Sequence, residues 1–439
     1  MNTLNMARTA LLLATLSLGV GNQALALDGI PADDQLKYGE DLVVSASALF
    51  ANEDRAYLGG EADSLVWRFM GVGKFDSDTP DVDPETAWRA HSQEHHHAIN
   101  QTHDDERNQA DRGERSGRQL WTAVNLKTGF EYEVDLPEEF GNRLFRRAEQ
   151  MGWNAGNEGS AVSRDSDTED NTRGWSNGND TRTRRFNNTS YPFRAMGQMG
   201  GGTTSGCSGT LVGRHHVLTA AHCLYTMSSD SWVSSAGTRF RPGREGTCNN
   251  ASCEPYGEFN ARWYFTPSQF RAVDNNWAYD YGIMVTWGNP GNATGWLGYV
   301  ATSQNTLNSY CDKVPFGPGY LGGNCYNRGY PACGFAEAPA NCQQGWAYQD
   351  LNPCEMGSFS STGTDGWKSI FRTNCDMGRG HSGSALFTDV WNGSGKVVFG
   401  VASTQSCSTC DAGSDWPNGF RRVTPDVLSA ISYFKSAFP

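Results

Sequence analysis

The chain has 439 residues, a formal net charge of −13 at pH 7 and 38% hydrophobic residues. This length allows two or three domains, with at least one sizeable core. The acidic balance and the lack of a basic stripe exclude nucleic acid as an expected partner. After the first residues no apolar run is long enough to cross a bilayer, so no membrane partner is expected either.

The N-terminus is typical of an export signal, which we assign to residues 1–26. Arg8 precedes an apolar run over residues 10–20, and Ala24 and Ala26 provide the small-residue pattern of a cleavage site. The run is too short to span a membrane. We therefore expect secretion to the periplasm or the extracellular space.

Charge and cysteine content divide the rest of the chain into two halves. Residues 27–180 carry 32 acidic and 15 basic residues, a net charge of −17, and no cysteine. Residues 181–439 carry 16 acidic and 19 basic residues, a net charge of +3, and all twelve cysteines. So many cysteines in an exported chain indicate disulfides rather than thiols.

The acidic half has modest folding signals, and we assign residues 27–153 to a small α+β pro-region. The pattern predicts a helix over 41–58, a strand over 64–72 and a hairpin over 120–136. A second helix is predicted over 137–151, with one apolar face.

Residues 154–180 are rich in Gly, Ser, Asn and Asp and read as a flexible linker, because they cannot bury enough apolar surface to offset their ordering entropy. We expect the pro-region to be removed, or at least cut, in this linker or at 182–185. Opposite charge makes the pro-region an expected intramolecular partner of residues 181–439. A permanently attached accessory domain is the alternative.

The second half shows short strand-like runs separated by Gly, Pro and Asn, which is typical of an all-β barrel or sandwich. The runs cover 262–265, 282–287, 383–388 and 396–404. The chain then ends in a predicted helix. Thr424 is its N-cap, Pro425 its first residue, and its inward face carries Val427, Leu428, Ile431 and Phe434.

His222 follows a predicted hairpin made of residues 207–212 and 217–219. Cys207 and Cys223 come near each other across this hairpin, where a disulfide can hold the loop of the histidine. An imidazole that acts as a general base needs such fixing, because ring position decides which hydroxyl it reaches.

Ser382 and Asp280 are the candidate partners of His222. Glycines at 380 and 383 flank Ser382 and allow a tight turn that aims the amides of Gly380 and Ser382 at one point, as an oxyanion site requires. Asp280 leads into an apolar strand, so its carboxylate is drawn inward toward an imidazole. Asp274 is the rival acid, but polar residues follow it.

The sequences around these three residues resemble the signatures of chymotrypsin-fold serine endopeptidases, in the chain order of that family. The segments are Thr219-Ala220-Ala221-His222-Cys223, Asp280-Tyr281-Gly282-Ile283 and Gly380-His381-Ser382-Gly383-Ser384. The last segment, and the entry from Asp180 to Ala195, resemble the bacterial glutamyl-endopeptidase branch. The resemblance covers residues 181–439.

This resemblance implies two six-stranded antiparallel barrels with a catalytic triad in the cleft between them. Ser382 would be the nucleophile, His222 the base and Asp280 the group that orients it. Ser403 matches a position that lines the cleft and supports the aspartate, so we take it as a substrate-binding candidate. The implied substrate is a protein or peptide, and no metal or other cofactor is implied.

Three positions depart from relatives within the family. His381 stands where trypsin-like enzymes carry the Asp that pairs with a new N-terminal amine. Ala402 stands where the glutamyl-specific branch uses a histidine, which weakens an expectation of cleavage after Glu. Asp376 matches the specificity carboxylate of trypsin, so we take it as a substrate-binding candidate.

Two other functions fit parts of the chain. His91, Glu94 and His95 match an inverted zinc-peptidase pattern, although the surrounding residues are almost wholly polar. A catalytically weak binding protein on a protease scaffold is the second alternative, since His381 can distort the turn before Ser382.

Cysteine spacing suggests further disulfides that close short loops, although sequence alone leaves the connectivity open. The suggested pairs are Cys248–Cys253, Cys311–Cys325, Cys333–Cys342, Cys354–Cys375 and Cys407–Cys410.

Overall fold

The computed structural model describes most of the second half of the chain and shorter stretches of the first. The described residues are 43–45, 66–76, 118–127, 129–137, 180–200, 206–234, 238–272, 277–301, 304–311, 324–335, 338–362, 368–391, 395–405 and 418–438. The predicted export signal, residues 138–151 of the predicted second helix and the linker up to residue 179 lie outside these residues. Residue 137, predicted to begin that helix, is the last residue of a strand. Among the described residues no helix is long and apolar enough to cross a membrane.

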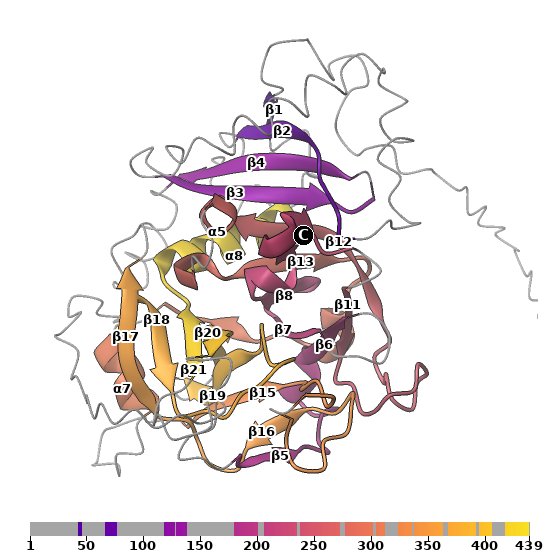
Figure 1. The fold of residues 1–439 in the computed structure, drawn as a ribbon, viewed down its shortest axis with the longest axis vertical. Helices are drawn as coiled ribbons and strands as arrows, with labels where there is room; N and C mark the ends of the chain where they lie inside the picture. Colours follow the sequence, from indigo (N-terminus) through magenta and orange to yellow (C-terminus); the bar gives the residue numbers. More distant parts are fainter. Residues whose placement is uncertain are drawn as a thin grey trace, which may run out of the picture.

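The first barrel is a closed ring of six antiparallel strands, ordered β12-β11-β6-β7-β8-β13, with β13 pairing back onto β12 (Figure 1). These strands are β6 (Met196–Gly200), β7 (Cys207–Leu211), β8 (His216–Thr219), β11 (Arg239–Pro242), β12 (Phe259–Pro267) and β13 (Gly282–Thr286). Every residue of β13 is buried, because a continuous apolar run suits a strand covered on both faces.

The second sheet runs β17-β18-β21-β20-β19-β15-β16-β5, and β14 pairs in parallel with β20. Its strands are β5 (Arg182–Arg184), β14 (Gly298–Tyr299), β15 (Cys325–Gly329), β16 (Tyr348–Asp350), β17 (Met356–Thr362), β18 (Lys368–Thr373), β19 (Ala385–Trp391), β20 (Gly395–Gln405) and β21 (Asn418–Arg422). β5 and β17 end the path without pairing to each other in the described part of the chain. The sheet is a curled half-barrel, and together with the closed first barrel it confirms the predicted all-β fold of two barrels.

The strands of the acidic half extend the first barrel instead of forming a separate unit. β1 (Val43–Ser45), β2 (Val66–Val72), β4 (Phe130–Pro137) and β3 (Arg118–Asn125) are ordered so that β3 joins β12. The hairpin predicted over 120–136 is confirmed by β3 and β4. The helix predicted over 41–58 is wrong at residues 43–45, where two β-branched valines pair with β2.

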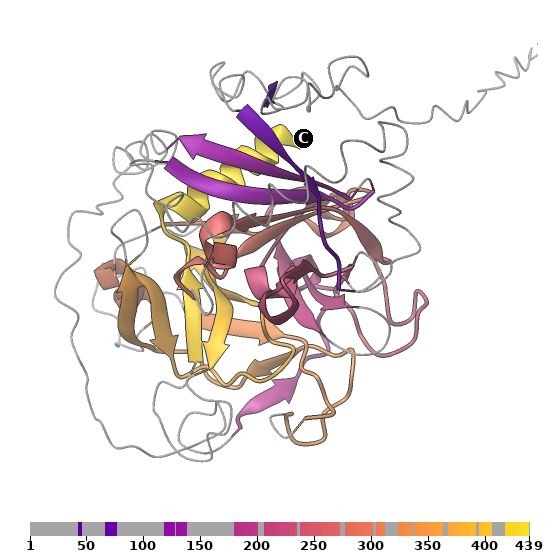
Figure 2. The same cartoon turned by 45° about the horizontal axis from the view of Figure 1, so that its top comes forward.

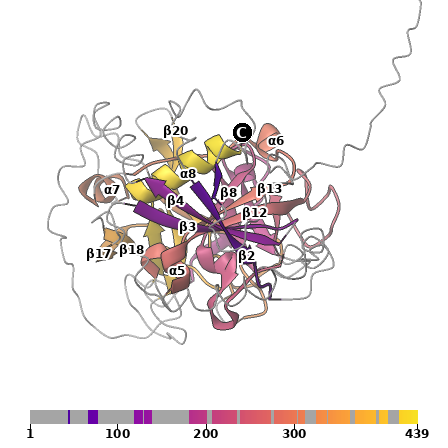
Figure 3. The same cartoon turned by 90° about the horizontal axis from the view of Figure 1, so that it is seen from above.

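The C-terminal helix α8 (Pro425–Ala437) lies beside β3 and β4 (Figures 2 and 3). Thr424 precedes it in an extended conformation, as predicted for the N-cap. Val427, Ile431 and Phe434 are fully buried, so the predicted inward face packs into the core of the first barrel. Short elements complete the described chain: β9 (Tyr225–Thr226), β10 (Ser231–Trp232), α5 (Ser268–Ala272), α6 (Gly291–Thr294) and α7 (Gln304–Cys311).

Candidate active site

The hairpin of β7 and β8 delivers His222. β7 and β8 pair through Leu211 and Val217, and a short 3-10 turn over Ala221–Cys223 follows β8. A disulfide joins Cys207, at the start of β7, to Cys223 in this turn. Because the disulfide ties the turn to the barrel, the backbone of His222 has little freedom to move.

Asp280 holds His222 through two atoms. Its carboxylate accepts a hydrogen bond from the ring Nδ1 at 2.7 Å and another from the main-chain N–H at 3.0 Å. Since a carboxylate only accepts, Nδ1 carries the proton and Nε2 keeps its lone pair. Asp280 is fully buried, whereas the side chain of His222 is 27% exposed. The ring is thus fixed on one side and open on the other.

The electrostatics of this pair favour a proton on the imidazole. Burial disfavours the charged ring, but the charge of Asp280 and its hydrogen bond outweigh burial and raise the pKa of His222 above its usual value. The Ser403 hydroxyl donates to the same carboxylate at 2.6 Å. Asp280 is therefore oriented by two neighbours, His222 and Ser403.

Ser382 lies on a glycine-dependent turn against the same hairpin. Its carbonyl accepts from Ser208 N–H in β7 at 2.7 Å. Gly383 has φ = 82°, and a Cβ there would lie 2.1 Å from Thr219 Oγ1 in β8. Only glycine allows this close approach, which brings the turn next to the strand that leads to His222. No hydrogen bond joins the Ser382 hydroxyl to the His222 ring within the described part of the chain.

The amides of Gly380 and Ser382 are not engaged by the rest of the described chain. Gly380 has φ = 92°, and a Cβ there would lie 2.4 Å from Tyr330 O. The preceding carbonyl, of Arg379, accepts from Ala332 N–H at 2.8 Å. Because N–H and C=O point in opposite directions across a peptide bond, this turns Gly380 N–H away from that neighbour. Neither amide donates a hydrogen bond among the described residues.

His381 supports the turn as a buried, neutral ring. Its Nδ1 bonds Asn327 Oδ1 at 3.1 Å, while the amide group of Asn327 donates to Ser384 Oγ at 2.7 Å. Its Nε2 is buried without a partner in the described chain. Burial lowers the pKa of His381 well below its usual value, and the positive charge of Arg182 lowers it further. The residue thus stays uncharged.

Asp376, the substrate-binding candidate, is 2% exposed and already has partners. Its carboxylate accepts from Thr181 N–H at 2.6 Å and from Thr181 Oγ1 at 2.9 Å. Asp350, which sequence reasoning missed, accepts from the same hydroxyl at 2.8 Å and from Asp376 N–H at 3.0 Å. Burial and the charge of Asp376 raise the pKa of Asp350 well above its usual value. The only sequence signal for Asp350 as a partner of Asp376 was an acidic residue at the end of a short strand.

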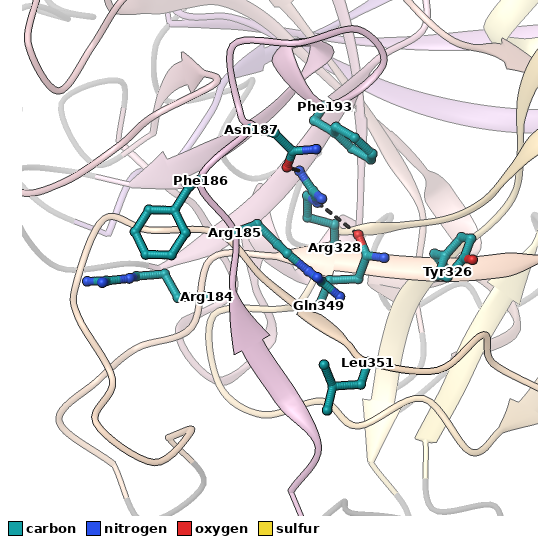
Figure 4. Close-up of a pocket in the computed structure, with 9 residues that line it drawn as sticks. All are labelled: Arg184, Arg185, Phe186, Asn187, Phe193, Tyr326, Arg328, Gln349 and Leu351. Carbon is teal, nitrogen blue, oxygen red and sulfur yellow. Dashed lines mark hydrogen bonds between the residues drawn. The ribbon is translucent and has the colours of Figure 1, made fainter.

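A hollow of about 560 Å³ lies over β5, β15 and β16 (Figure 4). Arg184, Arg185 and Arg328 line it together with aromatic and amide side chains. The Arg328 guanidinium stacks 3.4 Å above the Phe193 ring and donates to Gln349 Oε1 at 3.0 Å. None of the predicted site residues lines this hollow.

The remaining sequence candidates stand as follows. The zinc-peptidase residues His91, Glu94 and His95, and the rival acid Asp274, lie outside the described residues. Two described groups bring His, Cys or Asp ligand atoms together, but the cysteines of both are in disulfides and offer no thiolate.

The described disulfides are those suggested by spacing, namely Cys207–Cys223, Cys248–Cys253, Cys311–Cys325, Cys333–Cys342 and Cys354–Cys375. Cys407 and Cys410 are not among the described residues.

Comparison with known proteins places this geometry in context. The family model for trypsin matches residues 180–258. A glutamyl endopeptidase of Bacillus licheniformis is 38% identical over 130 residues, 30% of this chain and 38% of that protein. An extracellular metalloprotease of Bacillus subtilis is 36% identical over 135 residues, 29% of this chain and 40% of that protein. The chain thus spans about two fifths of the length of these relatives.

One solved structure, described as Glu endopeptidase in complex with MPD, covers 59% of this chain and 98% of its own, at 22% identity and a TM-score of 0.41. The fold itself is read from the strand order, a closed barrel followed by a curled half-barrel. In fold and in sequence, the chain resembles the chymotrypsin-fold serine proteases, with a glutamyl endopeptidase among its relatives.

Proposed function

We propose that the protein is an exported serine endopeptidase that hydrolyses peptide bonds in proteins or peptides. The observation that carries the proposal is the hydrogen bond from His222 Nδ1 to the buried Asp280 carboxylate, 2.7 Å long. It leaves the Nε2 lone pair on the open side of the ring, and the glycine-flanked Ser382 turn is tied to the same hairpin. This is the arrangement that nucleophilic catalysis by serine needs.

In the proposed reaction the Ser382 oxygen attacks the substrate carbonyl while His222 Nε2 accepts the hydroxyl proton. The carbonyl oxygen becomes an oxyanion that the amides of Gly380 and Ser382 stabilise. His222 then gives its proton to the leaving amine as the C–N bond breaks, and an acyl-enzyme remains. Water repeats the sequence, with His222 as base and then as acid, and releases the carboxylic acid.

Asp280 and Ser403 act through the imidazole in this scheme. Asp280 holds the tautomer with the proton on Nδ1 and stabilises the imidazolium that forms during attack. Ser403 donates to the carboxylate and holds its orientation. Asp280 does not contact the substrate in the proposed mechanism and is a positioning residue. Ser403 stays a substrate-binding hypothesis in addition to its contact with Asp280.

The residue preferred at the cut depends on Asp376. Cleavage after Arg or Lys requires Asp376 to exchange its two hydrogen bonds with Thr181 for a substrate cation. Cleavage after Glu or Asp needs a cationic partner, and Ala402 stands where the glutamyl-specific branch has a histidine. We keep Asp376 as the substrate-binding hypothesis, to be tested by profiling the cuts in a peptide library.

Export and processing complete the proposal. Five disulfides in the described residues, the apolar run behind Arg8 and an extracellular relative support secretion. We place the processing cut in residues 154–179 rather than at 182–185. Arg182 is 5% exposed, paired with Asp180 at 2.8 Å, and part of β5, so a protease reaches its peptide bonds poorly.

A metallopeptidase is the second candidate function, because one relative is named an extracellular metalloprotease. His91, Glu94 and His95 are the residues of this chain that match a zinc pattern. The two functions differ in which inhibitor stops proteolysis. A protease scaffold without activity is the third possibility, and it predicts no covalent labelling of Ser382.

The test compares the secreted protein with its Ser382→Ala variant in casein hydrolysis, with and without EDTA. We expect the variant to lose about 10⁶-fold in kcat and the chelator to have no effect. Ser252→Ala is the matched control, because Ser252 is exposed and only its main-chain N–H is hydrogen-bonded. A fluorophosphonate should label the wild type and not the Ser382→Ala variant.

Two outcomes contradict the proposal. Proteolysis that survives Ser382→Ala and is lost in EDTA assigns the activity to a metal site. A folded protein that neither cleaves casein nor reacts with the fluorophosphonate is the inactive scaffold.

A further inference from the structure

We infer that the N-terminal strands β2, β3 and β4 are a permanent part of the first barrel. They stay bound after the chain is cut in residues 154–179, and they hold the segment that carries Asp280. The interaction surface is the outer edge of β12 together with α5, Tyr281 and α8. Its partner is the set of strands β2, β3 and β4, which belong to a separate polypeptide once the cut has been made.

The main chain supplies the first contact. β3 pairs antiparallel with β12 from Asn125 opposite Trp263 to Trp121 opposite Pro267. β12 is also a wall of the closed barrel, since it pairs with β13 and β11. Strand addition of this kind joins two segments through backbone hydrogen bonds and needs no covalent link between them.

Apolar packing supplies the second contact. Trp121 has no exposed surface, and its ring lies 5.3 Å from the ring of Tyr281 and 5.1 Å from that of Phe434 in α8. Tyr132 on β4 lies 5.8 Å from Trp263 on β12. These side chains share one continuous core with the barrel. Loss of β2, β3 and β4 would open that core to water.

A buried ion pair supplies the third contact. Glu131 on β4 is 2% exposed, and its carboxylate accepts from Arg271 Nη1 at 2.8 Å and from Trp232 Nε1 at 2.7 Å. Arg271 belongs to α5 and stacks 4.3 Å from the Tyr225 ring. Thr122 and Ser268 share a further hydrogen bond of 2.7 Å. Removing Glu131 would leave the Arg271 charge buried without this carboxylate, which is strongly unfavourable.

These contacts converge on the segment around Asp280. α5 precedes Asp280 by a few residues, and Tyr281 directly follows it. Glu131 therefore restrains the chain before the aspartate, and Trp121 restrains the chain after it. Both are positioning residues for the Asp280–His222 pair. The contacts themselves do not depend on the proposed function, but their importance for catalysis rests on it.

The first experiment uses the full chain with Ser382→Ala, to prevent self-cleavage, and a site for a sequence-specific protease inserted after Gly156. We expect the two pieces to elute together on gel filtration after the cut and to separate only in denaturant. Pieces that elute apart, with the C-terminal piece still folded by circular dichroism, overturn the inference.

Variants of the cut protein test the contacts. Glu131→Gln and Trp121→Phe should each raise the dissociation rate of the two pieces about tenfold or more. Lys127→Ala, on the exposed turn of the same hairpin, is the matched control and should leave the rate unchanged. Equal rates in all three variants contradict the assigned surface.

A readout of His222 tests the positioning. In the uncut Ser382→Ala protein, NMR titration of the His222 ring reports its hydrogen bond to Asp280 without any need for activity. Trp121→Phe and Glu131→Gln should lower the His222 pKa relative to Lys127→Ala in proteins of equal fold. An unchanged titration assigns the strands a role in stability alone and overturns the positioning part.

Discussion

The proposed chemistry depends on Asp280, which is fully buried and accepts hydrogen bonds from both the ring and the main chain of His222. A buried carboxylate is costly unless it is paired and hydrogen-bonded. Ser403 contributes a further hydrogen bond to the same carboxylate. The local arrangement therefore favours the His222 tautomer with its proton on Nδ1.

Asp280→Asn should lower kcat by about 10⁴-fold near neutral pH, because the amide no longer enforces the productive tautomer. The acid limb of kcat/KM should also move to lower pH. The charge of Asp280 raises the pKa of His222, so its removal lets the ring stay neutral, and basic, in more acidic solution.

A pH profile of kcat/KM for peptide hydrolysis checks both effects. Ser403→Ala is the graded comparison, since it keeps the carboxylate and loses only one hydrogen bond, and its acid limb should move less. An Asp280→Asn enzyme with a wild-type profile would show that His222 titrates independently of Asp280.

At the scale of elements, the β7–β8 hairpin combines local signals with one crosslink. Its strands, its turn and its final histidine follow from the spacing of apolar and small residues. The Cys207–Cys223 disulfide spans 16 residues, and it restricts the unfolded chain as well as the loop of His222.

The double substitution Cys207→Ala/Cys223→Ala should lower the free energy of unfolding by about 3 kcal/mol. The control Cys248→Ala/Cys253→Ala opens a loop with a separation of only 5 residues and should cost less, about 2 kcal/mol. Urea denaturation of both proteins in the Ser382→Ala background measures the difference. A greater loss in the control would mean that native-state contacts, rather than loop length, set these contributions.

At the scale of the whole molecule, two buried histidines lie far apart in the chain, His216 in β8 and His381 in the turn before β19. His216 in β8 donates from Nε2 to Phe434 O at 3.0 Å, and its Nδ1 has no partner in the described chain. Burial, and then the neighbouring His215, lower the pKa of His216 well below its usual value. Burial does the same for His381. Folding therefore requires both rings to be neutral.

We expect the folded state to lose stability as the pH falls below about 6.5, the ordinary pKa of histidine in an unfolded chain. There the unfolded state binds protons that the folded state excludes, so unfolding becomes more favourable. Each histidine contributes a slope of at most about 1.4 kcal/mol per pH unit.

Urea denaturation between pH 7.5 and 5.5 tests this, with His216→Gln/His381→Gln compared against the parent protein. The double variant has lower stability at pH 7.5, because it loses packing, but its dependence on pH should be shallower. Parallel curves for the two proteins would exclude these rings as the source of acid sensitivity.

The sequence alone determined the features that depend on neighbours along the chain. The strand runs of the second half, the 120–136 hairpin and the N-cap of α8 follow from spacing, turn residues and apolar periodicity. Cysteine spacing suggested the short-loop disulfide pairs but left their connectivity open. The candidates His222, Asp280 and Ser382 were recognisable from their neighbours: a hairpin before the histidine, an apolar strand after the aspartate and glycines on both sides of the serine.

Only the tertiary structure decided which distant edges and charges meet. The addition of β3 to β12, the burial of Glu131 against Arg271 and the contact of Asp376 with Thr181 each join residues far apart in the chain. The difference in charge between the two halves predicted a separate unit for the acidic half, because charge is counted along the chain and not in space. An exposed strand edge, however, pairs through backbone N–H and C=O groups, which are the same for almost every residue. The local sequence therefore does not indicate which strand will pair with that edge.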